Sequence, residues 1–301
     1  MRCLVTGIAG FTGKHLADFL LQQEEVEVAG LVRSSDVSLP GVRISIVDVT
    51  NQRALLQVFR QLWPDFVFHL AVIARNASLQ EMVRVNVLGT ENVLAAAAEV
   101  GSTVLLPGSA AEYGRAQTSL VAERHPIAPI NEYGVSKAAQ VMLARQRFLS
   151  RGVSAYIARV FNVVGPGQPR NFACADIAER ALRLSVSGRL RVDNAAASRD
   201  FIDVRDVCEA YWHIVTRGRP GEIYNVCTGE EHTFGEVGKM LLELCGKQAC
   251  TIDKGLLDSN VVPAMVGDPS KIRKDTGWTP KRSLRSALED VLAYQRVQMG
   301  R

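Results

Sequence analysis

The first half of the chain alternates short apolar runs with longer segments of helical spacing, and this alternation constrains the fold more than any other feature. The apolar runs, which read as buried strands, lie at residues 3–5, 26–32, 42–47, 66–70, 103–106 and 154–160. The segments with helical spacing lie at 11–22, 52–62, 81–100 and 132–150. Strands and helices that alternate in this way form a parallel sheet covered on both faces. The pattern therefore predicts an α/β fold with a doubly wound parallel sheet.

The regular alternation ends near residue 163. The glycine and proline break GPGQPRN at 165–171 is followed by helical patterning near 173–187, 206–217, 233–245 and 282–296, and EIYNVCTG at 222–229 reads as a late strand. Clusters of glycine and proline mark loops between periodic segments. We therefore expect a sheet domain over residues 1–163 and a smaller C-terminal region over 164–301 that is interleaved with it.

Composition excludes several function classes. Of the 301 residues, 47% are hydrophobic and 22% are charged, and the net charge of +4 is spread along the sequence. A positive charge spread in this way suits the binding of anionic small molecules rather than of nucleic acid. The alternative is that these charges form only ordinary solvated surface. No apolar run reaches the roughly 18 residues of a membrane span, so we expect no membrane segment. MRCLVTG at the start enters a strand at once, so we expect no signal peptide.

The six cysteines, at positions 3, 174, 208, 227, 245 and 250, form no CxxC pair. Zinc sites and redox pairs commonly use that spacing, and disulfide frameworks belong to short secreted chains. The pattern predicts reduced thiols in a cytoplasmic protein without a metal site.

A glycine-rich turn follows the first predicted strand and opens the first predicted helix. In TGIAGFTG at 6–13, Gly7, Gly10 and Gly13 form a G-x-x-G-x-x-G variant of the dinucleotide-binding fingerprint, with Phe11 and Thr12 between them. Glycine permits a tight turn and a close approach of the backbone to a pyrophosphate, which the free N–H groups of the helix N-terminus then bind. Residues 1–163 are therefore predicted to be a Rossmann-like dinucleotide-binding domain.

The ends of the second and third predicted strands bear on which dinucleotide binds. Where NAD-binding proteins carry an acidic residue for the ribose 2′-hydroxyl, this chain has Arg33 followed by two serines. An arginine complements a 2′-phosphate, so NADP(H) is favoured, and NAD(H) stays an option if Arg33 is only a solvated strand end. Asp48 and Val49 are expected at the adenine, where Asp48 would meet the amino group or instead cap the helix after Thr50.

Three residues have the chemistry of a proton-transfer site. Tyr133 and Lys137 in NEYGVSK at 131–137 are four apart and therefore share one face of a predicted helix. A tyrosine with a pKa of about 10 is a weak acid or base at neutral pH, and an ammonium beside it favours the phenolate. The lysine can also reach the ribose hydroxyls of a nicotinamide cofactor. Ser109, in GSAAEYG at 108–114, follows a buried strand and completes the predicted catalytic set.

These segments and others resemble a known family. In chain order they are TGIAGFTG, HLA (69–71), NVLGTENVL (86–94), GSAAEYG, YGVSK, ARVFNVVGPGQ (158–168), SRDFIDVRDVCEAY (198–211), YNVCTGEE (224–231) and GDPSKIRKDTGWTP (267–280). They cover nearly the whole length. The chain is similar to extended short-chain dehydrogenases/reductases of the sugar-nucleotide branch, and it most resembles the GDP-4-keto-6-deoxy-mannose reductases, relatives of GDP-mannose 4,6-dehydratase.

The resemblance implies roles for the residues at matching positions. Ser109 would hydrogen-bond the reacting carbonyl or hydroxyl, Tyr133 would relay the proton, and Lys137 would be its partner. Leu70 and Ala71 match backbone that lines the cofactor.

Three further positions match substrate-binding residues, namely Asn162, Asn171 and Arg199. A guanidinium forms bidentate hydrogen bonds with phosphates, so Arg199 would meet the diphosphate of a sugar nucleotide. The alternative for Arg199 is an ion pair with Asp200 or Asp203.

Two departures from the family pattern bear on the reaction. Dehydratases of this branch carry Glu or Asp two residues after the catalytic Ser or Thr, and Ala111 at that position supplies neither the acid nor the base of a water elimination. Glu112 is adjacent, but on an extended backbone it would point to the opposite side. In LDSNVVP at 257–263, Asp258 stands where many relatives have a phosphate-binding arginine, and Lys254 is the candidate to compensate.

We therefore expect NADPH-dependent reduction of the 4-keto group of a nucleotide-linked 4-keto-6-deoxyhexose, with GDP favoured. One alternative is an epimerase or dehydratase that retains NAD, against which Arg33 and Ala111 count. The other is a non-catalytic dinucleotide-binding regulator, against which Tyr133 and Lys137 count.

The remaining predictions concern packing. His69 is predicted to be a satisfied core histidine, and Tyr211 and Trp212 are predicted to be core residues. The segments near 81–100 and 132–150 carry broad apolar faces. The resemblance implies that they form a homodimer interface, and burial within one chain is the alternative.

Overall fold

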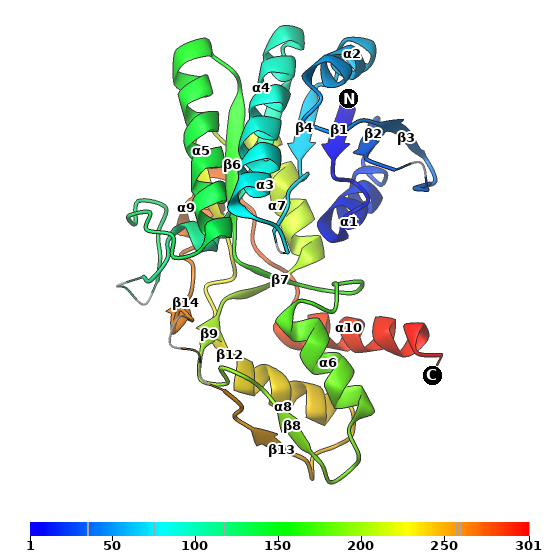
Figure 1. The fold of residues 1–301 in the computed structure, drawn as a ribbon, viewed down its shortest axis with the longest axis vertical. Coiled ribbons are helices and arrows are strands. Elements are labelled where there is room, and N and C mark those ends of the chain that lie inside the picture. The colour runs from blue at the N-terminus through cyan, green and yellow to red at the C-terminus, as the bar shows by residue number, and fades with distance from the viewer. Residues whose placement is uncertain are drawn as a thin grey trace.

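Seven parallel strands form the central sheet of the computed structural model, which describes residues 1–34, 36–74, 76–116, 118, 120–256, 258 and 261–300 (Figure 1). Their order is β11-β6-β5-β4-β1-β2-β3, and every neighbouring pair is parallel. They are β1 (Arg2–Thr6), β2 (Glu27–Val32), β3 (Val42–Ile46), β4 (Phe66–His69), β5 (Thr103–Ser109), β6 (Ala155–Val160) and β11 (Ile223–Val226). The carboxyl ends of all seven therefore lie along one edge. The predicted α/β fold is confirmed.

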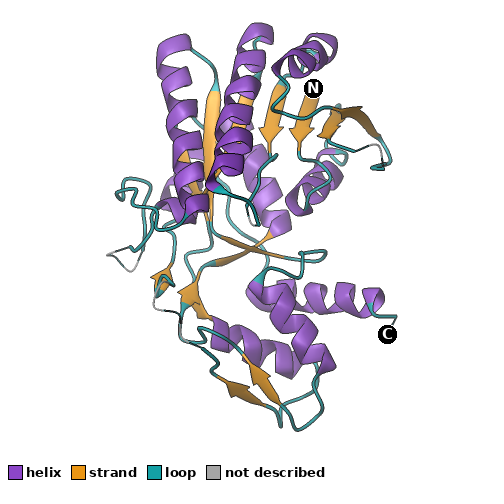
Figure 2. Ribbon diagram, in the orientation of Figure 1, coloured by secondary structure: helices purple, strands orange, loops and turns teal. Residues whose placement is uncertain are grey.

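Helices cover both faces of this sheet (Figure 2). One face carries α1 (Phe11–Leu20), α7 (Val204–Arg217) and α9 (Ser270–Thr276), and the other carries α2 (Gln52–Leu62), α4 (Gly89–Val100) and α5 (Glu132–Arg151). Leu16 and Ile214 belong to the core of the first face, and Phe59 and Leu94 to the core of the second. In β5, Val104, Leu105 and Leu106 are all buried, so this part of the strand is a continuous apolar run rather than an alternating one.

Local signals set both ends of α5, which carries two of the predicted catalytic residues. The Asn131 side chain accepts a hydrogen bond from the backbone N of Gly134 at 2.8 Å and so caps the first turn. Gly152, with a φ of 65°, ends the helix in the left-handed conformation that glycine adopts readily. Tyr133 is thereby placed in the first turn and Lys137 one turn later.

The chain after residue 163 builds a smaller region and returns to the sheet (Figure 1). Its strands pair as β7 (Asn162–Val164) with β10 (Phe201–Asp203), β9 (Ser198–Arg199) with both β12 (His232–Thr233) and β14 (Ala264–Met265), and β8 (Arg189–Arg191) with β13 (Thr251–Asp253). Its helices α6 (Ala173–Arg183), α8 (Phe234–Leu244) and α10 (Leu284–Gln298) enclose a separate core. β11, α7 and α9 lie among these elements in sequence but pack with the sheet, so the two parts are interleaved.

Besides shifts of a few residues at the ends of elements, the structure differs from the predicted elements at 79–88, 107–112 and 270–276. The predicted helix over 81–100 begins earlier, at α3 (Leu79–Met82), and passes through a π-helical segment, η1 (Val83–Leu88), before α4. β5 extends to Ser109 and is followed by a short 3₁₀ helix, η2 (Ala110–Glu112). The helix α9 leaves no periodic pattern in the sequence, because its seven residues are too few for one.

Candidate functional site

Two adjoining cavities open at the carboxyl edge of the sheet. The large cavity, of about 560 Å³, includes the end of β5 and the start of α5 in its lining, and the small cavity, of about 360 Å³, includes the turn between β1 and α1. Five residues line both, namely Phe11, Thr12, Leu70, Val72 and Phe172. One extended molecule can therefore occupy the two together. Open α/β sheets bind their ligands at this edge.

Glycines shape the floor of the small cavity. Gly7 has a φ of 68°, and a Cβ atom there would lie 2.8 Å from the backbone N of Ala71. A Cβ atom on Gly13 would lie 2.4 Å from the carbonyl oxygen of Gly7. Gly10 precedes α1 and offers no side-chain cap, so the first N–H groups of the helix are left for an anionic ligand. The turn thus fits the pyrophosphate of a dinucleotide.

The residues predicted for the nucleotide part of the cofactor all line the small cavity, namely Gly7, Gly10, Phe11, Thr12, Gly13, Arg33, Asp48, Val49, Leu70 and Ala71. Arg33 is exposed directly after β2. Asp48 accepts hydrogen bonds from the N and Oγ1 of Thr50 at 2.8 and 2.7 Å, while Asn51 caps α2. Burial raises the pKa of Asp48, but the hydrogen bonds from Thr50 and the charges of Arg33 and Arg84 bring it below its usual value.

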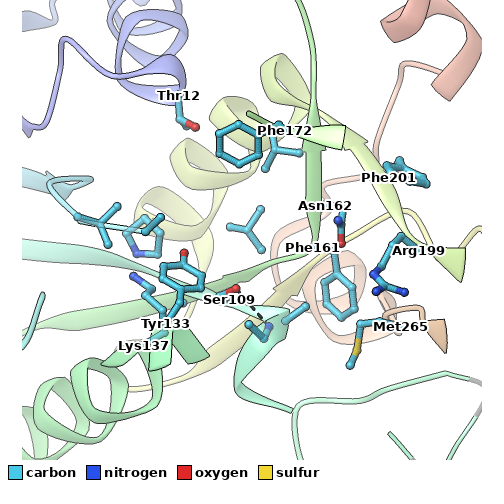
Figure 3. A pocket seen from close by; sticks show the side chains of 18 of the residues that line it. Thr12, Ser109, Tyr133, Lys137, Phe161, Asn162, Phe172, Arg199, Phe201 and Met265 are labelled. Atoms are coloured by element: carbon cyan, nitrogen blue, oxygen red, sulfur yellow. Dashed lines mark hydrogen bonds between the residues drawn. The ribbon is translucent and has the colours of Figure 1, made fainter. Parts of the chain in front are cut away.

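The large cavity brings together the three residues predicted to be catalytic. Ser109 ends β5, which lies between β4 and β6, and Tyr133 and Lys137 come from α5. Figure 3 shows the three on one side of the cavity, with Arg199 on the other. The Ser109 hydroxyl oxygen accepts a hydrogen bond from the backbone N of Ala111 at 3.2 Å, which leaves the hydroxyl proton for a ligand.

Burial controls the electrostatics of Lys137. Its side chain is 3% exposed, and its Nζ donates a hydrogen bond to Oε1 of Gln140 at 2.6 Å. Burial lowers the pKa of Lys137 to about 8, against the opposing effect of the Glu112 carboxylate. An ammonium in so dry a place acts strongly on a neighbouring phenol, because little water screens it.

Glu112 lies outside the large cavity, as expected, but the predicted reason is wrong. The backbone after Ser109 turns into η2 instead of staying extended, and this turn buries the carboxylate beneath the strand end. Its Oε1 accepts a hydrogen bond from the backbone N of Ser109 at 2.6 Å, and its Oε2 accepts one from Nε of Arg159 at 2.8 Å. Both charged side chains are 0% exposed. Sequence reasoning missed this buried ion pair because Glu112 and Arg159 are far apart in the chain.

Arg199 lies on the side of the large cavity opposite Tyr133 and Lys137 (Figure 3). Its guanidinium donates to the carbonyl oxygens of Ser198 and Val262 at 2.6 and 2.8 Å, and burial lowers its pKa. The predicted alternative, an ion pair with a neighbouring aspartate, is not formed: Asp200 accepts hydrogen bonds from Thr228, Gly229 and Gly267, and Asp203 pairs with Arg205. The guanidinium thus keeps its charge for a ligand.

Aromatic and apolar side chains form a wall that sequence reasoning missed. The lining includes Phe161, Phe172, Phe201, Phe234 and Met265, and the guanidinium of Arg199 lies 5.5 Å from the ring centre of Phe234. Phe161 and Phe201 adjoin residues that the motifs did identify, in RVFN and SRDF. The position of Phe161 and Phe201 within these motifs is the signal by which the sequence could have identified them.

Three predicted positions lie outside the cavities. Asn171 is exposed, and its neighbour Phe172 lines both cavities instead. Neither Asp258 nor Lys254 lines either cavity, and the backbone N of Asp258 donates to Oδ1 of Asn194 at 2.7 Å. The neighbours Leu257, Ser259 and Asn260, and Ser35 after the second strand, are outside the described residues. Asn162 does line the large cavity.

Of the three predicted core residues, His69 and Tyr211 are buried and Trp212 is partly buried. His69 is 2% exposed and hydrogen-bonded through both ring nitrogens, to Thr6 and Thr90, and burial lowers its pKa to about 3. Tyr211 is 3% exposed in the core and also lines the large cavity, and Trp212 packs partly buried against the same core.

All six cysteines are free thiols. Within the described ranges, no three His, Cys, Asp or Glu side chains are grouped to hold a metal ion. None of the helices in that part of the chain is long and apolar enough to cross a membrane.

Known proteins resemble this chain over its whole length. Residues 4–291 match the family model described as GDP-mannose 4,6 dehydratase. The chain is 29% identical to the GDP-6-deoxy-D-talose 4-dehydrogenase of Aggregatibacter actinomycetemcomitans, with 100% of both chains covered. It is 30% identical to the GDP-6-deoxy-D-mannose reductase of Pseudomonas aeruginosa, with 97% of this chain and 96% of the relative covered.

Solved structures agree in fold. The UDP-glucose 4-epimerase of Thermus thermophilus in complex with NAD has a TM-score of 0.87 at 29% identity, over 98% of this chain and 99% of that one. The enzyme RMD of Pseudomonas aeruginosa complexed with NADPH has a TM-score of 0.84 at 28% identity, over 99% of each chain. With a family model matching nearly its full length, the chain belongs to the GDP-mannose 4,6 dehydratase family and is an extended short-chain dehydrogenase/reductase that acts on sugar nucleotides.

Proposed function

We propose that this enzyme uses NADPH to reduce the 4-keto group of a nucleotide-linked 4-keto-6-deoxyhexose, with GDP as the nucleotide. The observation that carries the proposal is the chemistry of the large cavity, which presents Ser109, Tyr133 and Lys137 but no acidic side chain among its described lining residues. The residues left out of the description contain no Asp or Glu either. Such a cavity can donate a proton to a carbonyl, but it lacks the carboxylate expected for water elimination.

In this proposal each catalytic side chain has one task. NADPH, when bound, supplies the hydride to the keto carbon. The Tyr133 hydroxyl donates the proton to the keto oxygen, which becomes the product hydroxyl, and the Ser109 hydroxyl donates a hydrogen bond to the same oxygen. The oxygen gains negative charge as the reaction proceeds, so both contacts strengthen towards the transition state. Lys137 holds its charge near Tyr133 and lowers the cost of the phenolate left behind.

The preference for NADPH rests on Arg33. Its exposed guanidinium lines the end of the small cavity where the adenosine ribose is expected, and no acidic residue occupies that position. The relative RMD carries NADPH, whereas the similar epimerase carries NAD, so family membership leaves both cofactors open. An arginine at the end of β2 supports NADPH.

Substrate binding is assigned mainly to the region after residue 163, and cofactor binding to residues 1–163. Arg199 and Asn162 line the far part of the large cavity, where Arg199 would meet the diphosphate. GDP is favoured because two relatives that match over at least 96% of their length are named for GDP-linked sugars. Those two names imply opposite configurations at C4, because talose and mannose differ at that carbon.

We also propose that the enzyme is a cytoplasmic homodimer. Val135, Met142 and Leu149 are seven residues apart on α5 and are 45%, 66% and 77% exposed. Leu88, just before α4, is 55% exposed, and α4 and α5 pack side by side in Figure 1. An apolar stripe at heptad spacing suits helix pairing with a second copy of the chain.

The decisive experiment measures NADPH consumption by the purified protein with GDP-, dTDP-, UDP- and CDP-linked 4-keto-6-deoxy sugars. We expect turnover with the GDP sugar and a loss of about 100- to 10,000-fold in Tyr133→Phe, since general acid catalysis contributes that much. NMR of the product then gives its C4 configuration. Tightly retained NAD with C4 epimerisation, or a 4-keto product from GDP-mannose, would replace the proposal with an epimerase or a dehydratase.

A further inference from the structure

Beneath the catalytic pair lies a chain of buried hydrogen bonds that the mechanism above does not use. Lys137 Nζ donates to Oε1 of Gln140 at 2.6 Å, and Nε2 of Gln140 donates to Oγ1 of Thr90 at 2.6 Å. Oγ1 of Thr90 also forms a hydrogen bond with Nε2 of His69 at 3.0 Å. Nδ1 of His69 forms a second one with Oγ1 of Thr6 at 2.7 Å. All five side chains are at most 3% exposed. Water therefore cannot replace any of these partners.

Counting protons fixes the direction of each bond. The single hydroxyl proton of Thr90 goes to the carbonyl oxygen of Asn86, at 2.5 Å, so Thr90 can only accept from Gln140 and from His69. Thr6 accepts from the backbone N of Ala71 at 3.1 Å, which leaves its own proton for the unprotonated Nδ1 of a neutral His69. Burial lowers the pKa of His69 to about 3, which agrees with a neutral ring.

The orientation of the Gln140 amide follows. Its NH₂ group must face Thr90, because a flipped amide would set its carbonyl oxygen against a Thr90 oxygen with no proton left to give. Its carbonyl oxygen must then face the ammonium of Lys137. Gln140 is thus held from behind as a fixed, uncharged hydrogen-bond acceptor for Lys137.

We propose that Gln140 is a positioning residue of the reaction, which holds Lys137 in place without neutralising it. The inference rests on the proposed use of Tyr133 as the proton donor. A carboxylate at position 140 would also accept from the ammonium, but its second oxygen would lie against Thr90 without a proton between them. It would also cancel the charge of the ammonium and so weaken its effect on the phenol. An apolar side chain would leave a buried ammonium short of a partner.

The titratable groups near Lys137 and Tyr133 in the described part of the chain include Tyr211 on α7, whose pKa is raised by burial and by the charges of Cys208 and Tyr133. Tyr133 lies one turn before Lys137 on α5, Glu112 opposes the lowering of the Lys137 pKa from η2, and His69 on β4 is affected by the Lys137 charge. His69 stays neutral over the working pH range, and Glu112 is paired with Arg159. The alkaline limb of activity should therefore report the coupled loss of the first proton from Tyr133 and Lys137.

The test compares Gln140→Leu and Gln140→Glu with matched changes at Gln146, an exposed glutamine of the same helix that donates to Ser150. Two readouts are taken across pH: kcat for NADPH-dependent reduction, and the ultraviolet absorbance of phenolate minus that of each protein's Tyr133→Phe counterpart. The second readout needs no substrate, so it remains valid if the proposed reaction is wrong.

The two substitutions should move the alkaline midpoint in opposite directions. Gln140→Leu destabilises the ammonium, so the first proton leaves at lower pH. Gln140→Glu stabilises the ammonium and destabilises the phenolate, so the midpoint rises, in each case by about one pH unit. The Gln146 variants should leave it unchanged. Because a purely structural role would reduce stability and kcat without separating the midpoints, equal midpoints in parent and both variants overturn the proposal. If Gln140→Leu fails to fold, an unchanged alkaline midpoint in Gln140→Glu is enough to overturn the proposal. Absence of turnover on every keto sugar, with the phenolate shifts intact, rejects the proposed reaction and keeps this inference.

Discussion

The carboxylate of Glu112 joins the backbone N of Ser109, at 2.6 Å, to the buried guanidinium of Arg159, at 2.8 Å. The residue that presents a hydroxyl to the large cavity is therefore fixed by an ion pair on the other side of the strand end. Neither charge reaches solvent. The turn that positions Ser109 depends on a charge that takes no direct part in the proposed chemistry.

Removing one member of this pair should destabilise the protein. In Glu112→Gln the guanidinium of Arg159 stays buried without its counter-charge, which typically costs about 3–5 kcal/mol of unfolding free energy. Urea denaturation measures the loss. The exposed pair Arg60–Glu99 is the control, and Glu99→Gln should cost less than about 1 kcal/mol. The double variant Glu112→Gln/Arg159→Met should recover part of the loss, and parental stability in Glu112→Gln would refute the anchoring role.

Ser109→Ala should affect turnover far more than binding. Loss of a hydrogen-bond donor to a developing oxyanion costs about 100- to 1,000-fold in kcat, with KM little changed because the contact strengthens only towards the transition state. The serine also caps η2 through Ala111, so stability should fall by about 1 kcal/mol. Steady-state kinetics and thermal denaturation separate the two effects, with Ser109→Thr as the variant that keeps the hydroxyl. An unchanged kcat in Ser109→Ala would remove this serine from the mechanism.

Arg33→Ala should weaken NADPH and spare NADH. A charge-assisted contact to phosphate contributes roughly 1.5–3 kcal/mol, which corresponds to about 10- to 150-fold in Kd. Fluorescence titration of both cofactors measures it. Arg43→Ala serves as the control, because Arg43 is an exposed arginine on the neighbouring strand β3 and does not line the small cavity. Equal loss of both cofactors, or of neither, would contradict recognition of the 2′-phosphate.

Met142→Glu should convert the proposed dimer to a monomer. It places a charge in the middle of the exposed stripe on α5, where pairing would bury it. Sedimentation or light scattering gives the mass. Val297→Glu makes the same change on α10, where Val297 is 73% exposed, and should leave the mass unaltered. A dimer that survives Met142→Glu would place the interface elsewhere. A monomeric parent would reject the proposed dimer.

Stability should fall in mild acid through His69. Burial holds its pKa at about 3, below the 6.5 of an exposed histidine. Between those values the unfolded chain binds more protons than the folded one, so unfolding becomes easier as the pH drops below about 6.5. One such group contributes a slope of at most about 1.4 kcal/mol per pH unit. His69→Gln should be less stable overall, and its stability should fall less steeply in acid than that of the parent. Urea midpoints at a series of pH values test this, and an unaltered slope in His69→Gln would contradict it.

The sequence alone determined the sheet, the glycine turn and the placement of Tyr133 and Lys137 on one helix face. Continuous apolar runs predict buried parallel strands because such strands have no solvent face, and the helix period alone places Tyr133 and Lys137 together. The glycines at positions 7 and 13 had no substitute, since a side chain at either would collide with the backbone. These features are local, so a single sequence suffices to predict them.

Only the tertiary structure decided which polar side chains meet. Glu112 finds Arg159 across 47 positions, and Gln140 finds Thr90 across 50. Neither pairing leaves a periodic trace in the sequence. Local reasoning also assumed an extended backbone after Ser109, whereas η2 turns there and buries its carboxylate against a guanidinium from β6. Desolvation links these groups: a buried charge or amide must find its partner inside the fold, and the sheet and its helices determine which residues come within reach.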